Sequence, residues 1–145
     1  MGSITIEGGH RLGGDVTVQG AKNSVLPILA ATLLCGGECR IRRCPHLRDV
    51  DAAADILRYL GCKVDWSDGD LLVDSRVLTR CDIPQTLMRR MRSSVIFLGA
   101  ILARCGWAEL SYPGGCELGP RPIDLHLAAL RTLGASIEER GGKLY

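Results

Sequence analysis

The sequence contains two copies of one unit, and this repeat constrains the fold more than any other feature of the 145-residue chain. Ser24–Ala30 aligns with Ser94–Ala100 at an offset of 70 residues (94 minus 24), and Asp51–Gly61 aligns with Asp124–Gly134 at an offset of 73 (124 minus 51). The second copy therefore carries three additional residues between the two blocks. The repeat predicts two similar structural units, and the insertion marks the loop of the second copy as a candidate for function.

Each copy predicts the same series of elements. It begins with a helix that is apolar on every side, as is typical of a buried helix, and continues with a strand, an amphipathic helix and two short strands. Gly61 and Gly134 suit left-handed helix ends, and Pro122 suits a first helical position. The pattern predicts an α/β fold of β-α-β-α-β-β units with buried central helices and outer sheets. The predicted ranges are 25–34, 39–42, 50–60, 63–65 and 71–74 in the first copy and 95–103, 108–112, 122–133, 136–139 and 143–145 in the second.

The predicted organisation has three segments, residues 1–20, 21–90 and 91–145. The last two are the repeat units. The first stands outside the repeat, and apolar and polar residues alternate in its segments 4–6 and 16–18, on either side of paired glycines. This alternation predicts a β-hairpin, which needs a sheet to join.

Charge and composition exclude several functions. The net charge of +2 and the aromatic content of 4% give no basis for binding nucleic acid or a membrane surface. No apolar run reaches the length of a membrane span. Seven cysteines without CxxC spacing indicate a reduced, cytoplasmic environment, and the three histidines fit no zinc template. We expect a soluble protein with no metal and no cofactor, in which most cysteines pack as small apolar side chains.

One cysteine differs from the others by its position. Cys116 follows Gly114-Gly115 and precedes Arg121, which opens a predicted helix. The glycines permit positive φ and motion, and the nearby guanidinium favours the reactive thiolate. A loop that leads into a helix N-terminus is also where anions are held. We interpret Cys116 as a reactive residue.

The repeat also aligns two cations, because Lys22 and Arg92 are 70 residues apart (92 minus 22). Each comes just before a predicted buried helix, where its charge adds to the positive end of the helix dipole. With Arg121 at the start of a third helix, these cations are expected to converge on an anion such as phosphate. The alternative is three solvated surface cations, against which the symmetric pairing argues.

Four motifs follow one another along the chain: Gly20-Ala21-Lys22-Asn23-Ser24, Met91-Arg92-Ser93-Ser94, Pro113-Gly114-Gly115-Cys116 and Arg121-Pro122-Ile123-Asp124-Leu125-His126. They resemble the motifs of the UDP-N-acetylglucosamine 1-carboxyvinyltransferases, a branch of the enolpyruvyl transferase family. The resemblance extends from about Ile4 to the last residue. It implies transfer of the enolpyruvyl group of phosphoenolpyruvate to the 3-hydroxyl of UDP-N-acetylglucosamine, with release of phosphate, in the first committed step of peptidoglycan synthesis.

The resemblance also implies a role for each matching residue. Lys22 would hold the phosphate and carboxylate of phosphoenolpyruvate, and Asn23 would position the sugar nucleotide. Arg92 and Arg121 would bind anionic groups. Cys116 matches the family's cysteine, which protonates the methylene carbon of phosphoenolpyruvate, can trap it covalently and is alkylated by fosfomycin. The residues expected along the UDP-sugar are Arg121, Pro122, Ile123, Asp124 and Leu125, with Asp124 and His126 near the uracil and ribose.

Members of this family are nearly three times as long as the chain and have two domains of three units each. The resemblance therefore implies an N-terminal fragment of an inside-out α/β barrel, incomplete in this chain. Residues 1–20 would be opening strands of the other domain, and the missing remainder of the enzyme would be a partner. Three alternatives differ in class. The first is an inactive fragment or sugar-nucleotide-binding module. The second is a 5-enolpyruvylshikimate-3-phosphate synthase, whose lineage lacks a Gly-Gly-Cys loop of this kind, and the third is a thiol redox protein, which the absence of CxxC disfavours.

Overall fold

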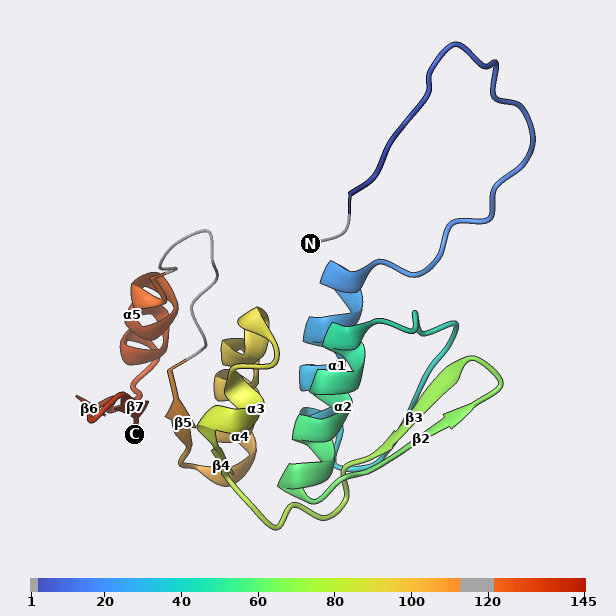
Figure 1. Ribbon diagram of the computed structural model, residues 1–145. Helices are drawn as coiled ribbons and strands as arrows, with labels where there is room; N and C mark the ends of the chain where they lie inside the picture. Colours follow the sequence, from blue (N-terminus) through green and yellow to red (C-terminus); the bar gives the residue numbers. More distant parts are fainter. Residues whose placement is uncertain (1–2, 113–121) are drawn as a thin grey trace.

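The computed structural model of the protein describes residues 3–112 and 122–145. Two α/β units lie side by side, and the segment before the first helix extends away from them as an arm (Figure 1). The predicted residues Cys116 and Arg121 lie outside the described part of the chain. None of the described helices is long and apolar enough to cross a membrane.

The first unit is a pair of helices packed on a three-stranded antiparallel sheet of order β1-β3-β2. Val73 in the central strand faces Cys39 on one side and Val64 on the other. The sheet presents Val64, Leu71 and Val73 to the helices, and its outer face carries Arg40, Asp65 and the exposed Leu72. The elements are α1 (Lys22–Cys35), β1 (Glu38–Ile41), α2 (Arg48–Leu60), β2 (Lys63–Ser67) and β3 (Asp70–Asp74).

The second unit has a four-stranded sheet of order β4-β5-β7-β6, in which β4 is parallel to β5 and the other pairs are antiparallel. Strand β4 pairs with β5 in this sheet, although it comes before residue 91, where the second unit is predicted to begin. The division of the chain into three segments stays a prediction. The elements are β4 (Asp82–Ile83), α3 (Gln85–Met88), the 3₁₀ helix η1 (Arg92–Ile96), α4 (Phe97–Cys105), β5 (Glu109–Ser111), α5 (Asp124–Thr132), β6 (Glu139–Arg140) and β7 (Lys143–Leu144).

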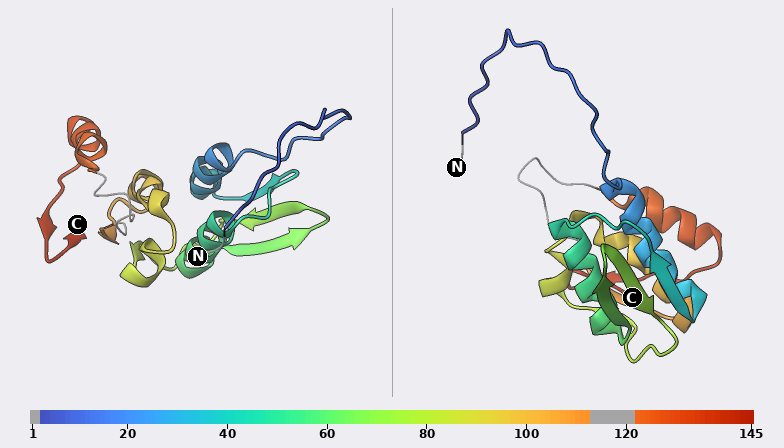
Figure 2. Two further views of the ribbon diagram at one scale, coloured as in Figure 1. Left: turned by 45° about the horizontal axis from the view of Figure 1, so that its top comes forward. Right: turned by 90° about the vertical axis from the view of Figure 1, so that its right-hand side faces the viewer.

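The repeat is visible in the two central helical segments. α1 has 14 residues from Lys22 to Cys35, and η1 continues into α4 to give an equivalent segment from Arg92 to Cys105. α1 packs against both α2 and α4, so the helices meet in the middle and the sheets lie on the outside (Figure 2). The largest buried side chains of this common core are Leu29, Leu33, Ile56, Leu57, Leu60, Leu71, Ile83, Met88, Met91, Phe97, Ile101 and Leu110.

The prediction that the first helix is buried on every side is wrong for α1. Leu29 and Leu33 are 0% exposed, whereas Ile28 is 50% and Leu34 is 54% exposed. The reason is that the elements that contact α1, which are α2, α4, η1 and β1, leave Ile28 and Leu34 uncovered. Apolar composition therefore identified a helix with two apolar faces, of which this chain buries one.

Two smaller predictions also need correction, and one is confirmed. Residues 3–20 form no strand, and Ile4 and Val16 are 89% and 87% exposed, because neither of the two described sheets pairs with this segment. α5 begins at Asp124 with Ile123 as its N-cap, so Pro122 precedes the helix instead of occupying its first position. The left-handed helix ends are confirmed by φ values of 109° at Gly61 and 97° at Gly134.

Candidate functional site

Four helical segments of the described chain start at one common end of the molecule. The N-terminal ends of α1, α2, α5 and the continuous segment of η1 and α4 face upward in Figure 1. The first N–H groups of a helix have no intrahelical partner and carry partial positive charge. This end is therefore the part of the described structure best suited to hold an anion.

Lys22 is the first residue of α1 and carries one of the two predicted cations. The N-cap residue, Ala21, makes no side-chain cap hydrogen bond, and the first turn contains no acidic residue, so nothing within α1 neutralises this end. The Lys22 Nζ lies 3.0 Å from Oδ2 of Asp49, and the lysine side chain is 50% exposed. The ammonium is thus held near the helix start and remains accessible to solvent.

Asp49 is a site residue that the sequence analysis did not identify. It lies in the first turn of α2, where a carboxylate is favoured by the helix dipole. Its pairing with Lys22 joins the starts of α1 and α2. The signal available in the sequence was an acidic residue next to the predicted start of the helix at residue 50, but no rule of spacing connects it to a lysine 27 residues earlier (49 minus 22).

Arg92 is the first residue of η1, as Lys22 is of α1, and this equivalence agrees with the repeat. Two buried neighbours hold its backbone: Met91 is 1% exposed, and Ser94 is 0% exposed and donates its Oγ to the Met88 carbonyl at 3.0 Å. η1 contacts α1. Arg92 itself is exposed, and among the described residues no carboxylate lies within ion-pair distance of it. Its charge is available to a ligand.

The remaining predicted residues divide into two groups. Asn23 follows Lys22 in the first turn of α1 and is exposed. The motif at the start of α5 lies at the same end of the molecule but in the second unit, beyond η1 and α4 from α1 (Figure 1). Within it Leu125 is 81% exposed, Asp124 and Pro122 are exposed, and Ile123 and His126 are partly buried.

His126 has an unusual environment among these residues. Its Nε2 atom is buried and has no hydrogen-bond partner within the described part of the chain. A buried polar atom without a partner costs free energy, so such atoms in native proteins generally call for an explanation. The neighbouring helix residue Leu127 is buried in the core, which fixes the side of α5 that faces inward.

The chain that leads into residues 113–121 is anchored at Tyr112, and its contacts connect it to α5. The Tyr112 hydroxyl donates a hydrogen bond to Glu139, and the Tyr112 N–H donates to the Gly142 carbonyl at 3.1 Å. The Glu139 carboxylate raises the pKa of Tyr112 by accepting this bond. The Tyr112 hydroxyl and then the Arg131 guanidinium lower the pKa of Glu139. Since Arg131 belongs to α5, Glu139 connects the end of β5 to the helix that carries the 122–126 motif.

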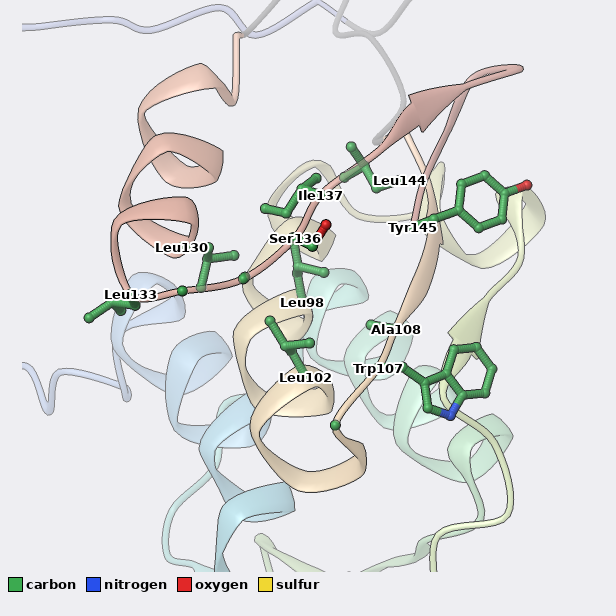
Figure 3. Close-up of a pocket in the computed structure, with 13 residues that line it drawn as sticks. Leu98, Leu102, Trp107, Ala108, Leu130, Leu133, Ser136, Ile137, Leu144 and Tyr145 are labelled. Atoms are coloured by element: carbon green, nitrogen blue, oxygen red, sulfur yellow. The ribbon is translucent and has the colours of Figure 1, made fainter.

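An apolar groove of about 550 Å³ lies elsewhere, between α4, the end of α5 and β7. Figure 3 shows its leucine, tryptophan and tyrosine side chains, and none of the predicted site residues lines it. It exists because α5 buries only Leu127, whereas α2 buries seven residues against the first unit. Within the described residues there is also no group of three metal-ligating side chains. The candidate site is therefore the cationic helix end.

Comparison with known proteins shows the family of the chain. The sequence pattern of one family, EPSP synthase (3-phosphoshikimate 1-carboxyvinyltransferase), matches residues 6–145. The chain belongs to this carboxyvinyltransferase family. The family resemblance predicted from the four motifs is thereby confirmed, and the roles of the individual residues stay predictions.

Two relatives narrow the comparison within the carboxyvinyltransferase family. The chain is 54% identical over 142 residues to UDP-N-acetylglucosamine 1-carboxyvinyltransferase 2 of Caldanaerobacter subterraneus subsp. tengcongensis, and 49% identical over 143 residues to UDP-N-acetylglucosamine 1-carboxyvinyltransferase of Prosthecochloris aestuarii. Each alignment covers 98% of this chain and 34% of the relative. The chain therefore spans about a third of the length of these relatives.

A solved structure of the same family supports the fold. The crystal structure of the enolpyruvyl transferase NikO from Streptomyces tendae matches with a TM-score of 0.78 at 26% identity, over 94% of this chain and 30% of the other. The predicted mixed α/β fold is confirmed. The described residues form no closed barrel, because their two sheets stand apart and α1 remains open on one side.

Proposed function

We propose that this carboxyvinyltransferase chain is part of a UDP-N-acetylglucosamine 1-carboxyvinyltransferase and supplies one side of its active site. The reaction would transfer the enolpyruvyl group of phosphoenolpyruvate to the 3-hydroxyl of the sugar nucleotide. The observation that carries the proposal is the position of Lys22 and Arg92 at the starts of two equivalent, contacting helical segments. The names of the relatives support the same substrate.

The cationic helix end suits phosphoenolpyruvate because this molecule carries a carboxylate and a phosphate. Lys22 and Arg92 would each pair with one anionic group, and the free N–H groups of the α1 first turn would add hydrogen bonds. A hydrogen bond to a charged group contributes about 1.5–3 kcal/mol. Loss of either cation should therefore weaken phosphoenolpyruvate binding by about 10- to 150-fold.

The chemistry would follow the family's addition and elimination. Cys116 would give its proton to the methylene carbon of phosphoenolpyruvate, while the sugar 3-hydroxyl gives its proton to a general base of the complete site and its oxygen bonds to the neighbouring carbon. The resulting tetrahedral intermediate would then release phosphate and return a proton of its new methyl group to the Cys116 thiolate, which forms the enolpyruvyl product. Asn23 would position the sugar nucleotide. Arg121 would bind an anionic group, and it and the residues that follow, Pro122, Ile123, Asp124, Leu125 and His126, would contact the UDP-sugar.

The proposal includes the rest of the fold. Residues 3–20 would pair with a sheet of another domain, which would account for their exposed alternating apolar residues. The open face of α1, including Ile28 and Leu34, would be covered when an inside-out α/β barrel is complete. The location would be cytoplasmic, as the cysteine pattern predicts.

A second candidate is the reaction of a 3-phosphoshikimate 1-carboxyvinyltransferase, because the matching family carries that description. Both reactions use phosphoenolpyruvate, so the cationic helix end serves either. The acceptor distinguishes the two reactions. UDP-N-acetylglucosamine should stimulate phosphate release in the first reaction, and shikimate 3-phosphate should do so in the second. A binding module without chemistry would bind substrates and release no phosphate.

The test joins residues 1–145 to the remaining two thirds of the Caldanaerobacter relative, which is 54% identical over the replaced part. Phosphate release from phosphoenolpyruvate is measured with each acceptor. We expect release with UDP-N-acetylglucosamine, a large loss in Lys22→Ala and Arg92→Ala, and little change in the matched controls Lys63→Ala and Arg89→Ala. Release with shikimate 3-phosphate alone, or equal loss in the controls, would overturn the proposal.

Asp49→Asn provides a second, opposite perturbation. Asp49 competes with an incoming anion for Lys22, and an exposed ion pair of this kind contributes about 0.2–1 kcal/mol. Its removal should tighten phosphoenolpyruvate binding by about 1.4- to 5-fold. Weaker binding in this variant would mean that Asp49 positions the lysine instead of competing for it.

A further inference from the structure

A pocket of about 570 Å³ lies where the arm, residues 3–20, meets the first unit. One wall is the end of the arm, and the other is the loop between β1 and α2. Among the described residues, neither cation of the candidate site lines this pocket, and no carboxylate does. The side chains of its lining that can form hydrogen bonds to a ligand belong to Thr17, Gln19, Arg42, Arg43 and His46.

The arm and the loop are in contact at Gly20. A Cβ atom at this residue would lie 3.1 Å from the Arg43 carbonyl oxygen and 3.1 Å from Cδ of Pro45. Both separations are tighter than ordinary Cβ contacts, so a residue without a side chain is what lets the two backbones come this close. The two walls of the pocket therefore support each other.

A buried carboxylate holds the loop in place. Asp70 is 8% exposed, its Oδ1 accepts a hydrogen bond from the Arg43 N–H at 2.7 Å, and its Oδ2 accepts one from Nε of Arg40 at 2.6 Å. The Cys44 N–H donates to the Gly69 carbonyl at 3.0 Å. Arg43 has a left-handed φ of 49°, which is uncommon for a residue with a side chain. The backbone of the loop is thus fixed by hydrogen bonds in which the Arg43 side chain takes no part.

The side chains of this loop carry unpaired positive charge. Arg42 and Arg43 are exposed, and neither forms an ion pair within the described part of the chain. His46 is also exposed, and its ring stacks on that of Trp66, with the centroids 3.8 Å apart. Both oxygens of the Asp70 carboxylate are already engaged. Two unpaired guanidinium groups favour an anion, and their planar shape matches a phosphate through pairs of parallel hydrogen bonds.

We propose that this pocket binds a phosphate-bearing ligand with more than one negative charge, which bridges the arm and the loop. Arg42 and Arg43 supply the charged contacts, and His46, Thr17 and Gln19 supply further hydrogen bonds. The site is separate from the one proposed for phosphoenolpyruvate. Its volume lies within the range of about 300–1,000 Å³ that is typical of small-molecule sites, so free diphosphate and the diphosphate of a nucleotide share the required chemistry.

The test is a titration of the ¹⁵N-labelled chain with inorganic diphosphate at constant ionic strength, followed by NMR of the backbone amides. The Lys22→Ala, Arg92→Ala double variant serves as the starting protein, so that anion binding at the candidate site does not contribute. We expect saturable shift changes in both walls, at residues 17–20 and 42–46. A second titration with ADP identifies the source of the phosphate: tighter binding of ADP assigns a nucleotide, and tighter binding of diphosphate assigns the free anion.

Two variants remove the guanidinium groups without disturbing the loop. Arg42→Gln keeps a polar side chain, and Arg43→Asn introduces a residue that adopts the left-handed conformation readily. Each should weaken diphosphate binding by about 10-fold or more, because it removes hydrogen bonds between charged groups. The control Lys63→Gln, Arg89→Gln removes two charges elsewhere and should change the affinity by less than about twofold, because salt screens charges outside the pocket. Equal weakening in the control, shift changes that do not saturate, or changes missing from either wall would overturn the proposal.

Discussion

Replacement of two adjacent leucines of α1 tests the one-sided burial of this helix. Leu33 is 0% exposed and packs into the core, whereas Leu34 is 54% exposed. Leu33→Ala and Leu34→Ala remove the same atoms from the same helix, so helix propensity and the unfolded state change equally. Any difference between the two variants therefore reports the environment of each side chain.

The expected magnitudes differ severalfold. A buried Leu→Ala change leaves a cavity and costs about 2–5 kcal/mol. Full burial of a leucine contributes about 1.5–3 kcal/mol, so a side chain that keeps about half of its surface in water should lose about 1 kcal/mol or less. Because small domains have total stabilities of about 5–15 kcal/mol, Leu33→Ala should lose a large share of the stability and Leu34→Ala a small one.

The assay is urea unfolding of the parent and both variants, followed by circular dichroism. With a slope of about 2 kcal/mol/M, Leu33→Ala should lower the midpoint by about 1 M or more, and Leu34→Ala by less than about 0.5 M. The measurement is repeated at a tenfold higher protein concentration to detect self-association. Equal losses in the two variants would refute the one-sided burial of α1 and show that its open face is covered in solution.

Two further predictions concern stability. Hydrogen bonds from the Arg76 side chain, and then from its backbone N–H, lower the pKa of Asp74 from 3.8 to about 2; the stability this provides is complete above about pH 5 and is lost as the pH falls from about 5 towards 2. The difference in urea midpoint between the parent and Asp74→Asn should therefore be constant above about pH 5 and shrink between about pH 5 and 2, and a constant difference down to pH 2 would contradict the ion pair. Gly69 has a φ of 80° and open space around it, so Gly69→Ala should lower the free energy of unfolding by about 1–3 kcal/mol through backbone strain alone, as measured by thermal unfolding. Gly61→Ala should lower the free energy of unfolding by more, because its Cβ would also meet Thr79 at 2.8 Å. Equal losses in the two variants would refute this close contact.

The repeat made much of the fold and part of the site predictable. It aligned Lys22 with Arg92, and the structure has each as the first residue of a 14-residue helical segment. Apolar periodicity predicted α2, whose seven buried residues face the core, and the glycine after it predicted its left-handed end. These features are local, because they depend on residues within a few turns of the helix.

The features that sequence reasoning missed depend on contacts between distant segments. The pairing of Asp49 with Lys22 arises from how α1 and α2 pack, which no spacing rule encodes. Strand β4 has only two residues, too few for an alternating pattern to be recognised. Apolar composition alone predicted α1 to be buried on every side, because it shows that a face requires cover but not whether the cover is present in the chain. The incomplete barrel that the family resemblance implies is what predicts central helices exposed on one side.

The most direct test of the central claim is a titration of the ¹⁵N-labelled chain with phosphoenolpyruvate, followed by NMR of the backbone amides. If the starts of α1 and η1 bind the anion, the largest shift changes should occur at residues 22–24 and 92–94, and the Lys22→Ala, Arg92→Ala double variant should abolish them. Lys63→Ala, Arg89→Ala serves as the control with the same loss of charge. Changes centred elsewhere, or unchanged in the double variant, would contradict the assignment of this helix end as the anion site.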